Sequence, residues 1–261
     1  MTLPLFEQRR GSLPLLVSFP HSGTFLPQSL RDRFTAKGRS LPDTDWFVPE
    51  LYRRCLDRFD VSTLIATHSR YIADLNRPAD GSALYPGRIE SAVCPSESFE
   101  GDAIYRAGHE LSGVEIPERI ARYWQPYHDA IAAERDRILA AHERCVIWDA
   151  HSIRSRSPRL FDGELPELNL GTFGGRSADA DISSRILERL GAQQRFSYVI
   201  DGRFKGGHIT RHFGAPARGV HAVQLEIAQR AYMSEEGAPR FEPQLAAPLA
   251  ELIAGIIGAL L

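Results

Sequence analysis

Residues 145–152 read C-V-I-W-D-A-H-S, an apolar run that ends in an acid and a histidine. An apolar run without alternation is typical of a strand buried on both faces, so residues 145–149 are a predicted strand. Five similar runs are predicted strands as well, at residues 15–19, 61–67, 168–172, 197–200 and 221–227. Because helical patterns separate these runs, the sequence predicts an α/β fold with a mostly parallel sheet.

Two of the predicted helices have polar residues placed to cap them. Residues 46–59 carry the first helical pattern, and Asp43 or Thr44 precedes it as an N-cap. Another helical pattern follows Ser177 and Asp179, either of which is a favoured capping residue. Polar residues at these places therefore have a structural explanation that requires no functional role.

The two remaining helical patterns are longer. The pattern over residues 117–144 contains Pro126, which should kink or divide the helix because proline lacks an N–H group. The last pattern, over residues 245–261, is the most apolar segment of the chain. It is shorter than the ~20 residues that a bilayer span needs, and it contains Pro248 and Glu251. We therefore predict a helix packed on the core and no membrane partner.

Composition narrows the classes of function. The 261 residues carry a formal net charge of −2 and include 43% hydrophobic residues, which suits one large domain or two small ones. This near-neutral charge argues against a nucleic-acid partner. Three widely spaced cysteines, Cys55, Cys94 and Cys145, form neither a disulfide framework nor a C-x-x-C metal site. With no signal-peptide pattern at the N-terminus, these features predict a reducing compartment, the cytoplasm.

Polar residues at predicted strand ends are the first candidates for a site. His21 follows the first strand in F-P-H-S-G, His151 follows W-D-A, and Glu226 lies within V-Q-L-E-I. Ligands of open α/β sheets bind at the carboxyl ends of the strands. Two histidines and one carboxylate, either Asp43 or Asp45 of P-D-T-D-W, are a ligand set typical of a metal hydrolase.

Each of these residues also has a structural explanation. The histidines fit turns, and the two aspartates fit caps. Glu226 fits a salt bridge, although a glutamate within an apolar run is rarely buried without a partner or a purpose. The D-A-H motif is similar to the D-A-H-x-D of manganese ureohydrolases, but Ile153 stands where a dinuclear site needs a carboxylate. Asp149 is placed to orient the ring of His151.

Basic residues beside these motifs indicate an acidic substrate. Arginine is suited to planar, bidentate recognition of carboxylates, although each arginine singly has a structural explanation. Gly206 and Gly207 allow a close approach of the backbone. Residues 78–95, rich in glycine and proline, predict a long surface loop, which is a candidate lid. The candidate substrate-binding residues are Arg70, Asn76, Arg77, Arg154, His208 and Arg211.

Taken in order along the chain, these motifs resemble the N-formylglutamate amidohydrolase family. The resemblance implies one catalytic domain over residues 1–261, similar in fold to zinc carboxypeptidases: a three-layer sandwich with a mixed, largely parallel sheet between helices. The matching segments are V-S-F-P-H-S-G-T (17–24), D-T-D-W-F-V-P-E-L-Y (43–52), T-H-S-R-Y-I-A-D-L-N-R-P (67–78), W-D-A-H-S-I (148–153), N-L-G-T (169–172), F-K-G-G-H-I-T-R (204–211) and V-Q-L-E-I-A-Q-R-A-Y-M (223–233).

The resemblance also implies a reaction, the hydrolysis of N-formyl-L-glutamate to formate and L-glutamate at the end of histidine degradation. One zinc ion, or another divalent metal, would be held by His21, Asp45 and His151, with Asp45 preferred to Asp43. Glu226 would act as general base and acid. The alternative is a related zinc deacylase acting on another N-acyl amino acid.

The remaining implied roles concern the substrate. Asn76 and Arg77 look like the carboxypeptidase pair that grips a substrate carboxylate. Arg70 would stabilise the developing oxyanion, and Arg154 or Arg211 would bind the second carboxylate.

Overall fold

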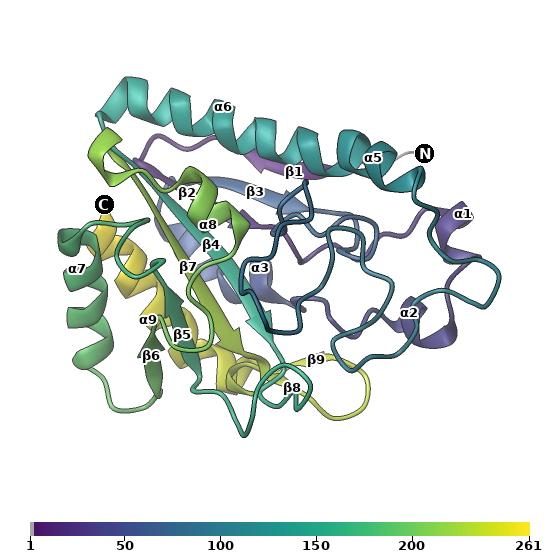
Figure 1. Ribbon diagram of the computed structural model, residues 1–261. Coiled ribbons are helices and arrows are strands. Elements are labelled where there is room, and N and C mark those ends of the chain that lie inside the picture. Colours follow the sequence, from purple (N-terminus) through teal and green to yellow (C-terminus); the bar gives the residue numbers. More distant parts are fainter. Residues whose placement is uncertain (1–2) are drawn as a thin grey trace.

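A mixed sheet lies between two layers of helices in the computed structural model, which describes residues 3–261 (Figure 1). Its seven strands have the order β1-β3-β2-β4-β7-β5-β6. The β1–β3 and β5–β7 pairs are antiparallel and the other pairs are parallel, as predicted. The strands are β1 (Phe6–Arg9), β2 (Leu15–Phe19), β3 (Ser62–Ala66), β4 (Cys145–Ile153), β5 (Leu168–Gly171), β6 (Tyr198–Ile200) and β7 (Val220–Ala228), with β8 (Met233–Ser234) and β9 (Arg240–Phe241) as a separate ribbon.

Helices cover both faces of the sheet. The helix α6 lies along one face, and α7 and α9 lie on the opposite face (Figure 1). The helices are α1 (Gln28–Arg31), α2 (Ala36–Ser40), α3 (Val48–Leu51), α4 (Arg53–Arg58), α5 (Glu115–Arg119), α6 (Gln125–His142), α7 (Ala180–Gly191), α8 (His208–Phe213) and α9 (Pro243–Leu260), with a π-helical turn η1 (Ile120–Trp124) and two single turns η2 (Pro216–Arg218) and η3 (Gln229–Ala231).

All six predicted strands are confirmed. The two central strands, β4 and β7, are longer than predicted and buried along their whole length. They pair in parallel in a register that sets His151 opposite Glu226. The edge strand β1 was not predicted, because three of its four residues are exposed and it has no apolar run.

The predicted helix over residues 46–59 is wrong as one element, because α3 and α4 divide it. The N-cap of α3 is Phe47, which has a left-handed backbone (φ 60°), and neither Asp43 nor Thr44 caps it. Asp43 instead accepts hydrogen bonds from the Tyr71 hydroxyl at 2.7 Å and the Phe99 N–H at 2.9 Å. The cap of α7 is confirmed, since Asp179 accepts from the Ile182 N–H.

The predicted interruption of the longest helix is confirmed. The helical segment begins at Glu115, two residues earlier than expected, and ends at His142. The π-helical turn η1 comes directly before α6, and Pro126 lies in the first turn of α6. Because proline cannot donate to the preceding turn, a change of hydrogen-bond register at this point is expected.

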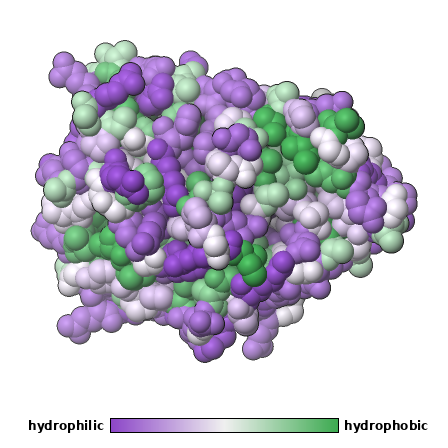
Figure 2. Space-filling model, viewed as in Figure 1, coloured by the Kyte–Doolittle hydropathy of each residue, from purple (hydrophilic) through white to green (hydrophobic). Residues whose placement is uncertain are grey.

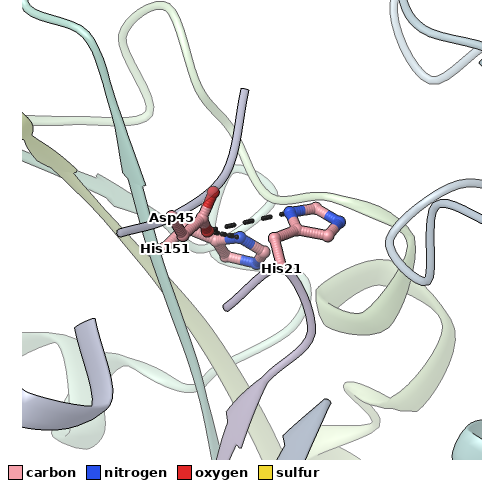
Figure 3. Close-up of side chains that lie close together, drawn as sticks. All are labelled: His21, Asp45 and His151. Carbon is pink, nitrogen blue, oxygen red and sulfur yellow. Dashed lines mark hydrogen bonds and ion pairs between the residues drawn. The ribbon is translucent and has the colours of Figure 1, made fainter. Parts of the chain in front are cut away.

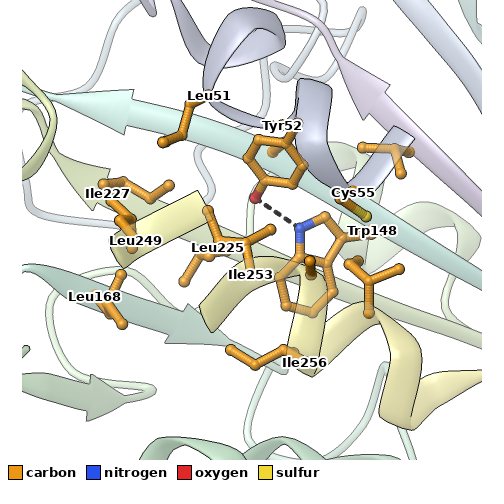
Figure 4. Close-up of a cluster of buried hydrophobic side chains, with 14 of the residues drawn as sticks. Leu51, Tyr52, Cys55, Trp148, Leu168, Leu225, Ile227, Leu249, Ile253 and Ile256 are labelled. Atoms are coloured by element: carbon orange, nitrogen blue, oxygen red, sulfur yellow. Dashed lines mark hydrogen bonds between the residues drawn. The ribbon is translucent and has the colours of Figure 1, made fainter. Parts of the chain in front are cut away.

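The core is divided by the sheet. Leu15, Val17 and Trp148 face α4, α7 and α9, whereas Leu16 and Ile147 face α6. Figure 4 shows the first cluster, in which the helical side chains pack over β4 and β7. Within this cluster the indole N–H of Trp148 donates to the Tyr52 hydroxyl at 2.8 Å.

The C-terminal helix α9 is the one helix of the described residues that is long and apolar enough to cross a membrane. Its apolar face packs in the core cluster through Leu249, Ile253 and Ile256, so the predicted core helix is confirmed. On the face of the molecule drawn in Figure 2, hydrophobic side chains occur in separate patches among hydrophilic ones.

Replacing Tyr52 by phenylalanine should destabilise the protein by about 1–3 kcal/mol, because the buried indole N–H of Trp148 would lose its acceptor. Urea unfolding of wild type and variant measures this difference. The expected change is in the midpoint, with an unchanged denaturant slope. Equal midpoints would contradict the assigned contact.

Acid should destabilise the protein through His128. Burial lowers the pKa of His128 from 6.5 to about 3, and its ring stacks on Trp124 with centroids 3.6 Å apart. Its stabilising effect is therefore fully present above pH 6.5 and is lost as the pH falls below that value, because only the unfolded chain gains the proton. Between pH 7 and pH 5 this one group should lower the free energy of unfolding by about 2 kcal/mol.

The variant His128→Phe keeps an aromatic ring for stacking and removes this titration. Denaturant unfolding at pH 7 and pH 5 should show a smaller loss of stability for the variant than for wild type. The same loss in both proteins would show that His128 does not cause it.

Candidate active site

Three residues far apart in the sequence converge at the carboxyl ends of the central strands. His21 lies in the turn after β2, His151 near the end of β4, and Asp45 in the loop before α3. Asp45 Oδ2 lies 3.0 Å from His151 Nδ1 and 3.7 Å from His21 Nδ1 (Figure 3). Asp45 is therefore the carboxylate that joins the two histidines, and Asp43 is not.

The cluster fits a single divalent cation. One ligand atom from each of His21, Asp45 and His151 lies within 4.8 Å of the others, and all three side chains are buried. Two imidazoles and a carboxylate suit zinc and related ions. Asp45 Oδ1 is buried and has no hydrogen-bond partner among residues 3–261, and Arg70 Nη1 lies 3.5 Å away. Arg70 therefore faces Oδ1, and Oδ2 is the oxygen that faces the two histidine rings.

Asp74 holds the ring of His21, and the sequence analysis missed it. Asp74 Oδ1 lies 2.7 Å from His21 Nε2, and Oδ2 accepts from Arg70 Nη2 at 2.7 Å. Burial and Arg70 lower the pKa of His21, and Asp74 opposes this change. With Nε2–H donated to Asp74, Nδ1 faces Asp45 as a free lone pair. The signal available in the sequence was the acid two residues before Asn76.

The predicted contact of Asp149 with His151 is confirmed. His151 Nε2 lies 2.8 Å from Asp149 Oδ2, and Nδ1 faces Asp45. Although burial lowers it, the carboxylates of Asp149 and Asp45 raise the pKa of His151 well above its usual range. The pocket therefore favours positive charge between these carboxylates, as a metal-binding site requires.

Asn76, predicted to bind substrate, is already engaged by the protein. Its Nδ2 donates to Asp149 at 3.0 Å and lies 2.9 Å from His151 Nε2, while its Oδ1 accepts from the Ile209 N–H. A side chain at Gly207 would place its Cβ 2.3 Å from Asn76 Nδ2. The glycine predicted to approach a ligand thus packs on Asn76, and Asn76 supports the His151 ring.

Glu226 is buried beside the cluster, with its side chain oriented by Gln224. The Gln224 amide donates to Glu226 Oε2 at 3.1 Å and accepts from the Gly207 N–H. Burial raises the pKa of Glu226 to about 7; His151 opposes this shift and Asp45 adds to it. A carboxyl group with a pKa near neutrality both accepts and returns a proton at physiological pH.

A cavity of about 610 Å³, partly open to solvent, leads to these residues. Residues 78–95 contain neither helix nor strand, as predicted, and Tyr85 and Glu90 of this loop line the cavity. Its wall also includes Arg70 and Arg77.

Three of the predicted substrate-binding residues lie outside the lining of this cavity. Arg154 donates to the Glu235 carbonyl at 2.6 Å. Arg211 donates to the Leu84 carbonyl and stacks on Tyr85. His208 stacks on His212, with centroids 5.1 Å apart. These contacts place all three in the packing of the surrounding loops and helices.

The fold and the site together are those of a hydrolytic enzyme of the α/β class. The chain belongs to the N-formylglutamate amidohydrolase family, whose family model matches residues 13–233. The resemblance that its motifs indicate is thus confirmed.

Two relatives support this assignment, and two solved structures share the fold. The N-formylglutamate deformylase of Pseudomonas putida is 43% identical over 252 residues, covering 97% of this chain and 94% of the relative. That of Pseudomonas aeruginosa is also 43% identical, over 253 residues and with the same coverage, 97% and 94%. The crystal structure of N-formylglutamate amidohydrolase from Ralstonia eutropha JMP134 has a TM-score of 0.82 at 23% identity, covering 99% of this chain and 98% of the other. A gene product of Agrobacterium tumefaciens has a TM-score of 0.75 at 18% identity, covering 98% of this chain and 94% of the other.

Proposed function

We propose that the protein hydrolyses N-formyl-L-glutamate to formate and L-glutamate with the help of one divalent cation. Two imidazoles and one carboxylate as ligands favour zinc as this cation. The observation that carries the proposal is the convergence of His21, Asp45 and His151 beside a cavity that His21, His151 and Glu226 line. These three residues would hold the cation. The 43% identity to two proteins named N-formylglutamate deformylase supports the choice of substrate.

The reaction breaks the amide C–N bond of the formyl group. When bound, the cation would lower the pKa of a water molecule and polarise the formyl carbonyl. Glu226 accepts the proton of the attacking water and later delivers it to the departing nitrogen. Arg70, which is buried and lines the cavity, supplies positive charge for the developing oxyanion.

Arg77 is the residue that we assign to the α-carboxylate of the substrate. Its Nε donates to the Ser91 carbonyl and its Nη1 to the Asn76 carbonyl, which fixes the guanidinium in the cavity wall. Among residues 3–261, no carboxylate lies within 4.0 Å of it. A fixed arginine without an acidic partner suits a substrate anion. Binding at Arg77 orients the formyl group toward Glu226.

We further propose that residues 1–261 form one catalytic domain that acts in the cytoplasm, in histidine degradation. Three buried free cysteines agree with a reducing compartment.

Rates with N-formyl-L-glutamate and N-acetyl-L-glutamate separate this function from the alternative, a deacylase for another N-acyl amino acid. The proposal predicts a higher kcat/KM for the formyl compound. A higher value for the acetyl compound would favour the alternative. Discontinuous assays of released L-glutamate measure both substrates in the same way.

A further inference from the structure

Arg203, which no sequence motif singled out, lines the same cavity as Arg77 and Glu226. It lies in the segment between β6 and α8, on the loop that leads to Gly206 and Gly207. We infer that Arg203 binds the side-chain carboxylate of the substrate and so makes the enzyme selective for a dicarboxylic N-acyl amino acid. This inference rests on the proposed function and adds the residue that distinguishes glutamate from its neutral analogues.

The contacts of Arg203 fix its position and leave its outer nitrogens for a ligand. Its Nε donates to the Leu160 carbonyl at 3.0 Å. Its guanidinium carbon lies 5.3 Å from the centre of the Phe204 ring and 5.6 Å from that of Tyr85. Within residues 3–261, neither Nη1 nor Nη2 has a hydrogen-bond partner, and no carboxylate lies within 4.0 Å. Two parallel N–H groups in a fixed plane match the geometry of a carboxylate.

The charge around Arg203 favours a ligand with negative charge. Burial lowers the pKa of Arg203, and repulsion by Arg88 and Arg77 adds to this change, whereas Tyr85 and Glu90 oppose it. Glu90 is the acid of this group, but its two oxygens accept from the N–H groups of Leu84 and Tyr85. An incoming carboxylate would relieve this repulsion.

Arg70 lines the cavity but has an acidic partner, and Arg154 and Arg211 lie outside the cavity lining. Arg70 pairs with Asp74 at 2.7 Å. Arg154 pairs with Glu100 at 3.4 Å, and Arg211 donates to two backbone carbonyls. Of the arginines that line the cavity, Arg77 and Arg203 have no carboxylate within 4.0 Å among residues 3–261. Their number equals the number of carboxylates on N-formylglutamate.

The test compares N-formyl-L-glutamate with N-formyl-L-glutamine, which has the same shape but a neutral amide. In wild type, kcat/KM should be much higher for the glutamate compound. The variant Arg203→Gln should lower this ratio by roughly 10- to 100-fold, mainly through KM, because a charge-assisted hydrogen bond is lost. The variant Arg203→Lys keeps the charge and should recover part of the ratio.

Arg195→Gln is the matched control. Like Arg203, Arg195 precedes a phenylalanine, and its guanidinium carbon lies 5.7 Å from the centre of the Phe196 ring. Unlike Arg203, Arg195 is exposed and lies outside the cavity lining. This variant should keep the wild-type ratio. An unchanged ratio in Arg203→Gln, or an equal loss on both substrates, would overturn the inference.

Binding of the products tests the inference without turnover. Calorimetric titration with L-glutamate and L-glutamine should show a preference for L-glutamate in wild type that Arg203→Gln weakens. If wild type releases no formate, the proposed function fails, and this titration still decides the role of Arg203. An equal preference in both proteins would contradict that role.

Discussion

Replacing Glu226 by glutamine should lower kcat for formate release by about 100- to 10,000-fold, the usual effect of removing a general base. The amide keeps the shape of the side chain and its place beside Gln224, but it cannot accept a proton from water. Bound metal should remain at the wild-type level, because Glu226 is not one of the three clustered ligands. Steady-state kinetics and elemental analysis of the same preparation measure both quantities.

Three measurements, kcat, bound metal and the unfolding midpoint, separate a loss of proton transfer from a loss of folding. The unfolding midpoint of Glu226→Gln should not fall near pH 8, since the substitution replaces a buried carboxylate by a neutral group. A kcat within tenfold of wild type would remove Glu226 from the proton transfer. A loss of metal together with activity would instead assign Glu226 to the metal site.

Replacing His151 by alanine should abolish formate release and remove the bound metal together. The substitution deletes one of the three ligands and leaves Asp45 and Asp149 without the positive partner that lies between them. Circular dichroism should show wild-type secondary structure, because β4 pairs with β7 along its whole length and with β2 over residues 146–149. Metal content and turnover are then compared at equal protein concentration.

His109→Ala serves as the control for this variant. His109 is exposed and belongs neither to the cavity lining nor to the cluster, so metal and activity should both stay at the wild-type level. A folded His151→Ala protein that still turns over would show that the metal site lies elsewhere.

The sheet and the clustered residues of the candidate site were largely predictable because both depend on short local patterns. Buried strands such as residues 145–149 are apolar without interruption, so a polar residue at the end of one stands out. His21 and His151 were found in this way, and the parallel order of β2, β4 and β7 brings such ends together.

The residues alone left the choice between Asp43 and Asp45 open, the family resemblance favoured Asp45, and the structure places Asp45 beside the histidines. The two acids are two residues apart in one loop, and only the path of that loop decides which one faces the histidines. Phe47 turns the chain with a left-handed backbone, so the expected caps never formed. Asp43 pairs with Tyr71, and Asp45 faces the cluster.

The residues that support the candidate site or line its cavity were harder to predict, because their partners lie far away in the sequence. Asp74 meets His21 across 53 positions, and Asn76 meets His151 across 75. Arg203 differs from Arg154 and Arg211 only in what surrounds it. The sequence showed an excess of arginines near the motifs, and the fold decides which of them face the cavity.

Formate release from N-formyl-L-glutamate is the most direct test of this account. The purified protein is assayed as prepared, after chelation, and after chelation followed by addition of zinc. We predict activity that chelation removes and zinc restores. No formate from metal-replete protein, or full activity after verified removal of the metal, would contradict a metal-dependent deformylase.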